Sequence, residues 1–223
     1  MVRASLRRGG LVVSCQARED NPLHGADFMR AMALAAAQGG AAGIRAEGVA
    51  DIAAIRHAVG LPLIGLLKRR REGFDVYITP GFDDAAAIVA AGCDVVALDA
   101  TAGTRNGEAV ETLIPRIRQE LGVAVMADIA TVAEGLAAAA LGADYVGSTL
   151  AGYTPARAAS VGPDLALLGE LVARCPVPVV AEGRFETPAQ VARAFELGAF
   201  AVVVGTAVTN PREITRRFAA RTR

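Results

Sequence analysis

A lysine and a glutamate that each end a short apolar run are the residues of this sequence best suited to move a proton. Lys68 ends the run LIGLLK, and Glu182 ends the run VVAE. Desolvation by the apolar run and a neighbouring cation, Arg45, would both lower the pKa of the Lys68 amine, so that it could act as a base beside a carbonyl. Glu182 could be a second acid or base, or could stabilise a cationic partner. Lys68 and Glu182 could instead form a structural ion pair, and the sequence leaves both readings open.

Nearly all of the remaining apolar runs also end in a polar residue. At a single position this is ordinary, because strand ends approach solvent, but the complete set favours side chains that converge on one pocket. In such a pocket Asp128 could orient a sugar hydroxyl. In chain order the eight runs end in Gln16, Arg45, Lys68, Asp99, Asp128, Thr149, Glu182 and Gly205.

Two glycine-containing segments near the end of the chain are suited to hold a phosphate group. Gly183 and Arg184 follow the seventh apolar run, and Gly205 and Thr206 stand at the end of the eighth. Glycine lets an anion approach the backbone, and the loops after the last two strands of a barrel often bind phosphate through N–H groups. Arg184 would add a fixed charge. Together these segments indicate a phosphorylated substrate.

The elements that must position these residues repeat as strand, helix and glycine. Near-continuous apolar runs predict strands covered on both faces, as in a parallel sheet. Eight such units in 223 residues predict an α/β fold, a (β/α)8 TIM barrel of the phosphate-binding type, with residues 1–223 as a single domain. The glycine fingerprint of a dinucleotide-binding sheet is absent. The predicted strands are Leu11–Gln16, Ala42–Arg45, Leu63–Lys68, Val95–Asp99, Val123–Asp128, Tyr145–Thr149, Val179–Glu182 and Ala201–Gly205.

Start and stop signals delimit helices between these strands. Thr or Asp precedes several helical segments, and Gly follows them, as expected for caps. The segments AAGCDVV, ALGADYV and ELGAFAVVV repeat one helix-to-strand turn. The run VYIT, at 76–79, fits neither element and is assigned to a long loop. The predicted helices are Ala26–Gln38, Asp51–Val59, Asp83–Ala91, Thr131–Leu141 and Thr187–Leu197.

Composition argues against several classes of protein. The chain has 23 Lys and Arg against 23 Asp and Glu, and this zero net charge argues against nucleic-acid or membrane-surface binding. The 3 cysteines are widely spaced, so neither a disulfide framework nor a zinc site is expected. His, Asp and Glu show no metal-ligand spacing. We expect a cytoplasmic protein without metal or cofactor, acting on a small molecule, with a homodimer as the default assembly.

Nine segments, in family order and over almost the whole chain, resemble N-acylmannosamine-6-phosphate 2-epimerases. The most specific motifs are SCQA, GIRA, AGYTP and AEGR, accompanied by IGLLKR, YITPGF, VVALDAT, VMADIAT and AVVVGTAVTNPREITRRF. The resemblance implies a cofactor-independent barrel. Its reaction would interconvert N-acetylmannosamine 6-phosphate and N-acetylglucosamine 6-phosphate in sialic acid breakdown.

The resemblance also implies a role for each site residue. Lys68 would be the base at C2, and Glu182 would be its partner acid or base, or would stabilise the developing charge. Tyr153 and Thr154 would lie in a loop over the substrate. Contacts with the sugar are implied for Gln16, Arg45 and Asp128. Contacts with the phosphate are implied for Gly183, Arg184, Gly205 and Thr206.

The chain departs from this family in three places. Segment 101–108, TAGTRNGE, is less basic than is usual there and has no proline, which puts a substrate contact from this loop in doubt. Thr206 replaces one glycine of a more usual Gly-Gly pair and stands at a possible phosphate contact. Asn210 stands where an arginine is expected, and the loss of that cation could weaken phosphate binding without abolishing the chemistry. Two alternatives remain: another sugar-phosphate epimerase or isomerase barrel, and a barrel that binds sugar phosphates without catalysis.

Overall fold

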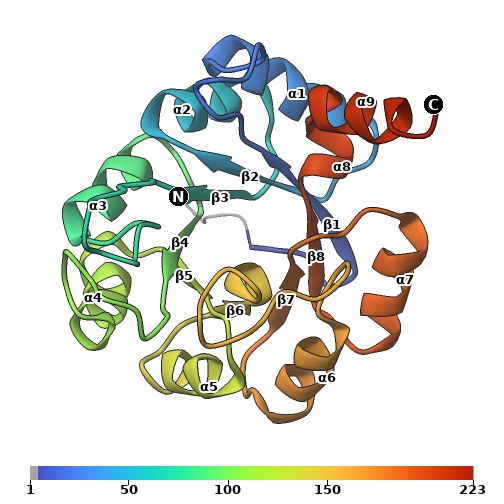
Figure 1. Ribbon diagram of the computed structural model, residues 1–223. Coiled ribbons are helices and arrows are strands. Elements are labelled where there is room, and N and C mark those ends of the chain that lie inside the picture. The colour runs from blue at the N-terminus through green and yellow to red at the C-terminus, as the bar shows by residue number, and fades with distance from the viewer. Residues whose placement is uncertain (1–4, 223) are drawn as a thin grey trace.

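The computed structural model describes residues 5–222, which form a closed barrel of eight parallel strands (Figure 1). Each strand pairs with the next in the chain, and the last closes the ring against the first. The predicted (β/α)8 barrel is therefore confirmed. The strands are β1 (Gly10–Cys15), β2 (Gly43–Glu47), β3 (Leu63–Leu66), β4 (Val95–Asp99), β5 (Ala124–Asp128), β6 (Tyr145–Gly147), β7 (Val179–Glu182) and β8 (Ala201–Val204).

Helices surround the ring of strands (Figure 1). In residues 5–222, no helix is both long and apolar enough to cross a membrane. All five predicted helices are present with ends within two residues of the prediction: α1 (Ala26–Gln38), α2 (Val49–Ala58), α3 (Phe82–Ala90), α5 (Val132–Ala140) and α7 (Pro188–Glu196). The other helical segments are α4 (Val110–Arg116), η1 (Ile117–Leu121), η2 (Ser148–Leu150), α6 (Leu165–Arg174), α8 (Thr206–Thr209) and α9 (Pro211–Ala219).

Alternate residues of each strand pack on opposite sides of the barrel wall. In β3, Ile64 and Leu66 belong to the cluster inside the barrel, whereas Leu63 packs outward with the helices. Both faces of a strand are therefore buried, which explains the near-continuous apolar runs. The same alternation turns Arg45 of β2 into the barrel, because its neighbour Ile44 packs outward.

Side-chain caps determine where α5 and α7 begin. The Thr131 hydroxyl accepts from the Glu134 N–H, and the Glu134 carboxylate accepts from the Thr131 N–H. Thr187 and Gln190 repeat this capping box at α7. After α5, Gly142 has a φ of +97°, a backbone conformation that other residues rarely adopt. The Thr start signals of α5 and α7 are thus real caps, whereas α1, α2 and α3 begin without a side-chain cap.

The loop between β3 and α3 folds back over the end of its own strand. Ile78 pairs with Lys68 in an antiparallel bridge and is buried. Thr79 anchors the loop, because its hydroxyl donates to the Ala97 carbonyl at 2.7 Å and accepts from the Leu67 N–H at 3.1 Å. The VYIT run belongs to a long loop, as predicted, and it closes one side of the barrel mouth.

Replacing Thr79 with valine is expected to loosen this loop. Thr79 is 0% exposed, so the change leaves a buried carbonyl and a buried N–H without partners. The free energy of unfolding should fall by about 1–3 kcal/mol, measured by urea denaturation. Thr79→Ser keeps the hydroxyl and should lose much less. Equal stabilities for the two variants would contradict this role.

Candidate active site

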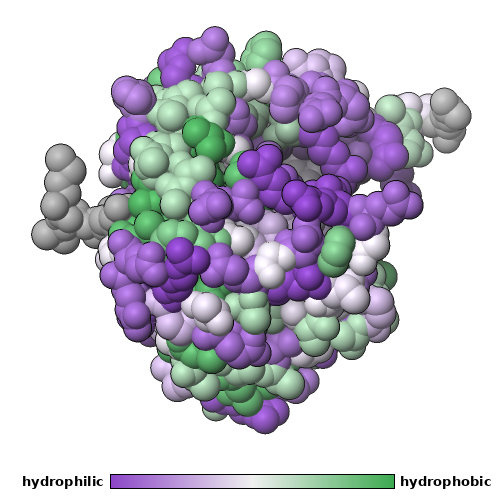
Figure 2. All heavy atoms as spheres, turned by 90° about the vertical axis from the view of Figure 1, so that its left-hand side faces the viewer, coloured by the Kyte–Doolittle hydropathy of each residue, from purple (hydrophilic) through white to green (hydrophobic). Residues whose placement is uncertain are grey.

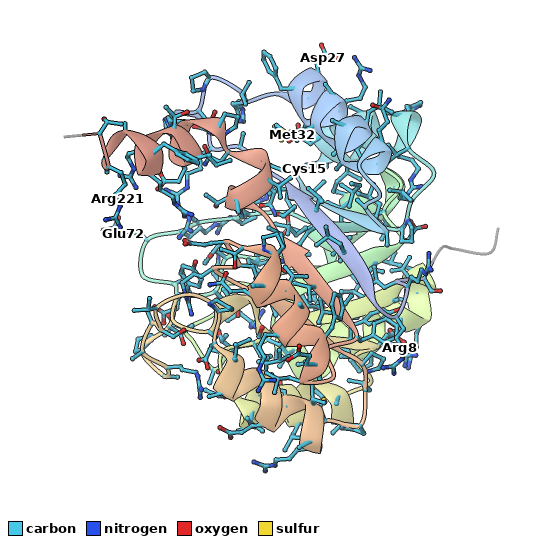
Figure 3. All side chains as sticks on the ribbon, turned by 90° about the vertical axis from the view of Figure 1, so that its right-hand side faces the viewer. Arg8, Cys15, Asp27, Met32, Glu72 and Arg221 are labelled. Atoms are coloured by element: carbon cyan, nitrogen blue, oxygen red, sulfur yellow. The ribbon has the colours of Figure 1, made fainter. Side chains whose placement is uncertain are left out.

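A pocket of about 390 Å³ opens at the C-terminal ends of the strands. This volume suits a small molecule, and the catalytic loops of barrels lie at this end. Figure 3 shows Glu72, in the β3–α3 loop, and Arg221 at one end of the barrel and Arg8 at the other. Asp128 and Thr154 do not line the pocket. The other predicted site residues do: Gln16, Arg45, Lys68, Tyr153, Glu182, Gly183, Arg184, Gly205 and Thr206.

A buried arginine shared by two carboxylates forms the floor of the pocket. Arg45 Nη1 lies 2.8 Å from Glu182 Oε2, and Nη2 lies 2.5 Å from Asp128 Oδ2. Arg45 is 1% exposed and Asp128 is 0% exposed. Burial alone would lower the pKa of Arg45, but the charges of Asp128 and Glu182 outweigh it and raise the pKa above its usual value. The guanidinium therefore stays charged.

Glu182 combines burial with a shared counter-ion. Its pKa is raised to about 7. Burial is the main cause and the charge of Asp128 adds to it, whereas the charge of Arg45 acts in the opposite direction. The Thr149 hydroxyl lies 2.6 Å from Asp128 Oδ1 and 3.2 Å from Glu182 Oε2. Because this hydroxyl has one hydrogen, it can donate to Asp128 while it accepts from a protonated Glu182. The site can thus hold one exchangeable proton near neutral pH.

Lys68 reaches into the same pocket from just beyond β3, because the strand ends at Leu66 and not at Lys68 as predicted. Its Nζ donates to Gln16 Oε1 at 2.6 Å, and Gln16 Nε2 donates to Ser14 Oγ at 3.0 Å. The amine touches solvent in the open pocket, yet the pocket walls desolvate it and lower its pKa. The charge of Arg45 lowers this pKa further. The observed ion-pair partner of Glu182 is Arg45, so the predicted alternative of a Lys68–Glu182 structural pair does not describe this arrangement.

The cations that follow Lys68 have separate environments. Arg69 pairs with Asp84 at 3.0 Å on the outer rim. The guanidinium of Arg70 is exposed but lies 3.8 Å from the centre of the Tyr77 ring, so it is not simply a solvated loop charge. Arg71 is exposed. Of these neighbouring cations, only Lys68 lines the main pocket.

The opposite end of the pocket contains the residues predicted to hold phosphate. Gly183 has a φ of +115°, which favours glycine, and Gly205 with Thr206 begins α8. Two cations that the sequence analysis missed, Arg18 and Arg217, also line this end. Neither follows a strand directly, and Arg217 belongs to the last helix, so no strand-end signal pointed to them.

Arg184 is engaged with the loop that follows η2. Its Nε donates to the Gly162 carbonyl at 2.9 Å, Nη1 donates to the Ala151 carbonyl at 2.8 Å, and Nη2 donates to Ser160 Oγ at 3.1 Å. The guanidinium also lies 5.3 Å from the Tyr153 ring centre. Arg184 therefore braces the loop that carries Tyr153. A phosphate contact by its side chain remains a prediction.

Position 210 and Cys15 have structural roles. The Asn210 side chain caps α9 by accepting from the Glu213 N–H at 3.2 Å, and it also lines the pocket. Cys15 is buried in β1, and burial raises the pKa of its thiol to about 12. A thiol with that pKa is a poor nucleophile, so Cys15 belongs to the core.

Comparisons with known proteins agree on one family. A family model described as "Putative N-acetylmannosamine-6-phosphate epimerase" matches residues 29–223. A relative named as a 2-epimerase for the same substrate, from Clostridium perfringens strain 13, is 47% identical over 212 residues, covering 95% of this chain and 96% of the relative. A relative of the same name from Enterobacter sp. strain 638 is 49% identical over 217 residues, covering 96% and 92%.

Solved structures agree with the sequence comparisons. The N-acetylmannosamine-6-phosphate 2-epimerase from Clostridium perfringens superposes with a TM-score of 0.93 at 45% identity, covering 96% of this chain and 94% of the other. A thiamine phosphate pyrophosphorylase from Pyrococcus furiosus reaches a TM-score of 0.61 at 17% identity, which reflects the fold alone.

The raised pKa of Glu182 predicts how stability depends on pH. An unfolded glutamate titrates near 4.3 and the folded one near 7, so the native state binds more protons between these values. The contribution of Glu182 to stability should therefore fall as pH rises from about 4.5 to about 7. In Glu182→Gln this fall should be smaller, which melting temperatures from pH 5 to 8 will measure. Parallel curves for the two proteins would refute the assignment.

Proposed function

The chain belongs to the N-acetylmannosamine-6-phosphate epimerase family and is an isomerase of the epimerase type, and from this premise we propose that Lys68 and Glu182 carry its proton transfers. The reaction interconverts N-acetylmannosamine 6-phosphate and N-acetylglucosamine 6-phosphate by removing and returning the C2 proton. The observation that carries the proposal is that an amine of lowered pKa and a carboxyl of raised pKa line one pocket. Both pKa values are shifted toward neutral pH, where the two groups can then exchange protons.

The chemistry begins with the open-chain sugar, whose C1 carbonyl acidifies the proton on C2. Neutral Lys68 removes that proton, and the electron pair forms an enolate with the carbonyl. Arg45 beneath the pocket supplies a fixed positive charge that favours the enolate. Glu182, protonated at the start of the step, then gives its proton to the opposite face of C2. Gln16 orients Lys68 through the 2.6 Å hydrogen bond.

Asp128 takes a different role from the predicted sugar contact. Because it is 0% exposed and holds Arg45 by two hydrogen bonds, it acts as a positioning residue for the guanidinium. Its charge also keeps the pKa of Glu182 high. Asp128 therefore adds to the effect of burial on the pKa of Glu182 without touching the sugar.

The phosphate binds at the end of the pocket where β7 and β8 finish. The turns at Gly183 and at Gly205 with Thr206 offer backbone N–H groups, and Arg18 and Arg217 add positive charge. Arg217 lies 2.9 Å from Glu186, so the phosphate competes with that carboxylate. These two arginines compensate for the asparagine at position 210.

Other properties of the protein belong to the same proposal. Residues 1–223 form one domain, the enzyme works in the cytoplasm, and two chains associate as a homodimer. The exposed apolar residues Val208 and Phe218, on α8 and α9, support association of two chains. The epimerization itself uses neither metal nor cofactor, because the lysine, the carboxyl and the arginine supply the base, the acid and the charge.

Replacing Lys68 with alanine is expected to abolish exchange at C2. In D₂O the intact protein should place deuterium on C2 of the product, and proton NMR measures the rate of this exchange. Exchange in Lys68→Ala should be slower by at least about 100-fold. Arg69→Ala is the matched control, because Arg69 is the adjacent cation and pairs outside the pocket. Binding of the sugar phosphate without exchange in the intact protein would favour the non-catalytic alternative.

Removal of divalent metals is expected to leave the rate unchanged. The protein is dialysed against EDTA, and the epimerization rate is compared with that of an untreated sample. A loss of rate that Mg²⁺ or Zn²⁺ restores would show that a metal takes part in the reaction.

A further inference from the structure

A second cavity of about 450 Å³, here called the β4 cavity, adjoins the main pocket. Tyr77, Leu150 and Tyr153 line both cavities, so these three side chains form the wall between them. Figure 2, which looks from the side of α3 and α4, shows a hollow rimmed by hydrophilic residues. Among the described residues that line the β4 cavity, none is proposed to act at C2 or to hold phosphate.

The β4 cavity lies across the barrel mouth from the proposed phosphate site. Asp99, the last residue of β4, lines it, and in the closed ring β4 lies opposite β8, where Gly205 follows. A hexosamine 6-phosphate carries its phosphate on C6 and its acylamino group on C2, toward the other end of the carbon chain. With phosphate at β8 and C2 beside Lys68, the acyl group extends toward β4.

Two polar groups in this cavity have unused hydrogen-bonding capacity. Asp99 is 2% exposed, and the hydrogen bonds that its carboxylate receives from described residues both end on Oδ1. They come from the N–H and the hydroxyl of Thr101, which leaves Oδ2 as the acceptor open to a ligand. The Thr154 hydroxyl oxygen is buried without a partner among residues 5–222. A ligand hydroxyl could donate to Asp99 and accept from Thr154.

Apolar walls complete the β4 cavity. Phe74, Tyr77 and Pro155 line it beside these polar groups. A short carbon chain that ends in a hydroxyl matches this combination of apolar wall and polar floor. The cavity is also larger than an acetyl group needs, since a whole water molecule occupies only about 30 Å³ in the liquid.

We propose that the β4 cavity is the subsite for the N-acyl group of the substrate and that it prefers acyl groups ending in a hydroxyl, such as N-hydroxyacetyl. This inference rests on the proposed function, because the positions of phosphate and C2 direct the acyl group to the cavity. Asp99 and Thr154 are then the residues that set acyl specificity, and Thr154 serves the acyl group rather than the sugar ring.

The test compares three mannosamine 6-phosphates that differ only in the N-acyl group: acetyl, hydroxyacetyl and propanoyl. Hydroxyacetyl and propanoyl have nearly the same size, so their ratio of kcat/KM isolates the hydroxyl. The intact protein should prefer hydroxyacetyl over propanoyl by about tenfold, the size expected for a hydrogen bond to a charged group. A hydroxyacetyl-to-propanoyl ratio near one, together with normal turnover of the N-acetyl compound, would overturn this inference and leave the proposed function standing.

Two substitutions test the residues themselves. Thr154→Val and Asp99→Asn should each lower the hydroxyacetyl-to-propanoyl ratio at least threefold, whereas Thr154→Ser keeps the hydroxyl and the ratio. Thr154→Val should fold normally, because the Thr154 hydroxyl has no partner in the described protein. If Asp99→Asn does not fold, Thr154→Val alone therefore tests the acyl specificity. A full ratio in Thr154→Val would overturn the assignment. No exchange at C2 with any of the three compounds would remove the proposed function and the inference together.

Discussion

A single buried arginine shared by two carboxylates is the interaction on which the rest of the site depends. A guanidinium cannot release its proton in a protein, so the charge of Arg45 must be balanced where it lies. Asp128 accepts two hydrogen bonds from Arg45, and Glu182 accepts one. Because one cation cannot neutralise two carboxylates in a place with little water, one carboxyl retains a proton to near neutral pH. The same charge helps to lower the pKa of Lys68, so one ion cluster shifts the pKa values of both proposed proton-transfer groups.

The barrel must leave room for this cluster, and two loops must close the space above it. Gly147 of β6 has no side chain, and a Cβ there would lie 2.3 Å from Met126 Cε and 3.1 Å from Asp128 Oδ1. Thr79 ties down the loop after β3, and Arg184 ties down the loop after η2. Tyr77 and Tyr153 on these loops form part of the wall between the two cavities. Hydrogen bonds thus hold both of the loops that carry this wall.

Most of the barrel and the strand-end part of the site could be predicted because their signals are local. Lys68 and Glu182 follow apolar runs, and parallel strands bring their C-terminal ends to one rim. Tyr77 was assigned to a loop without a function because only a fold-back pairing brings it to the mouth. Arg217 was missed because it joins the pocket from the final helix, far from any strand end. Such residues reach a site through packing, which leaves no fixed spacing in the sequence.

The sequence by itself determined the barrel, the rim where the candidate site lies and the family to which the residues point, because periodicity, caps and motif order are properties of neighbouring residues. Only the tertiary structure decided which partner each charge takes. Arg45, not Lys68, pairs with Glu182 at 2.8 Å, although 137 positions separate them in the chain. Arg184 holds a loop, and Asp128 lies beneath the pocket instead of lining it. Ion pairing and desolvation depend on distances in space, which the closing of the barrel sets.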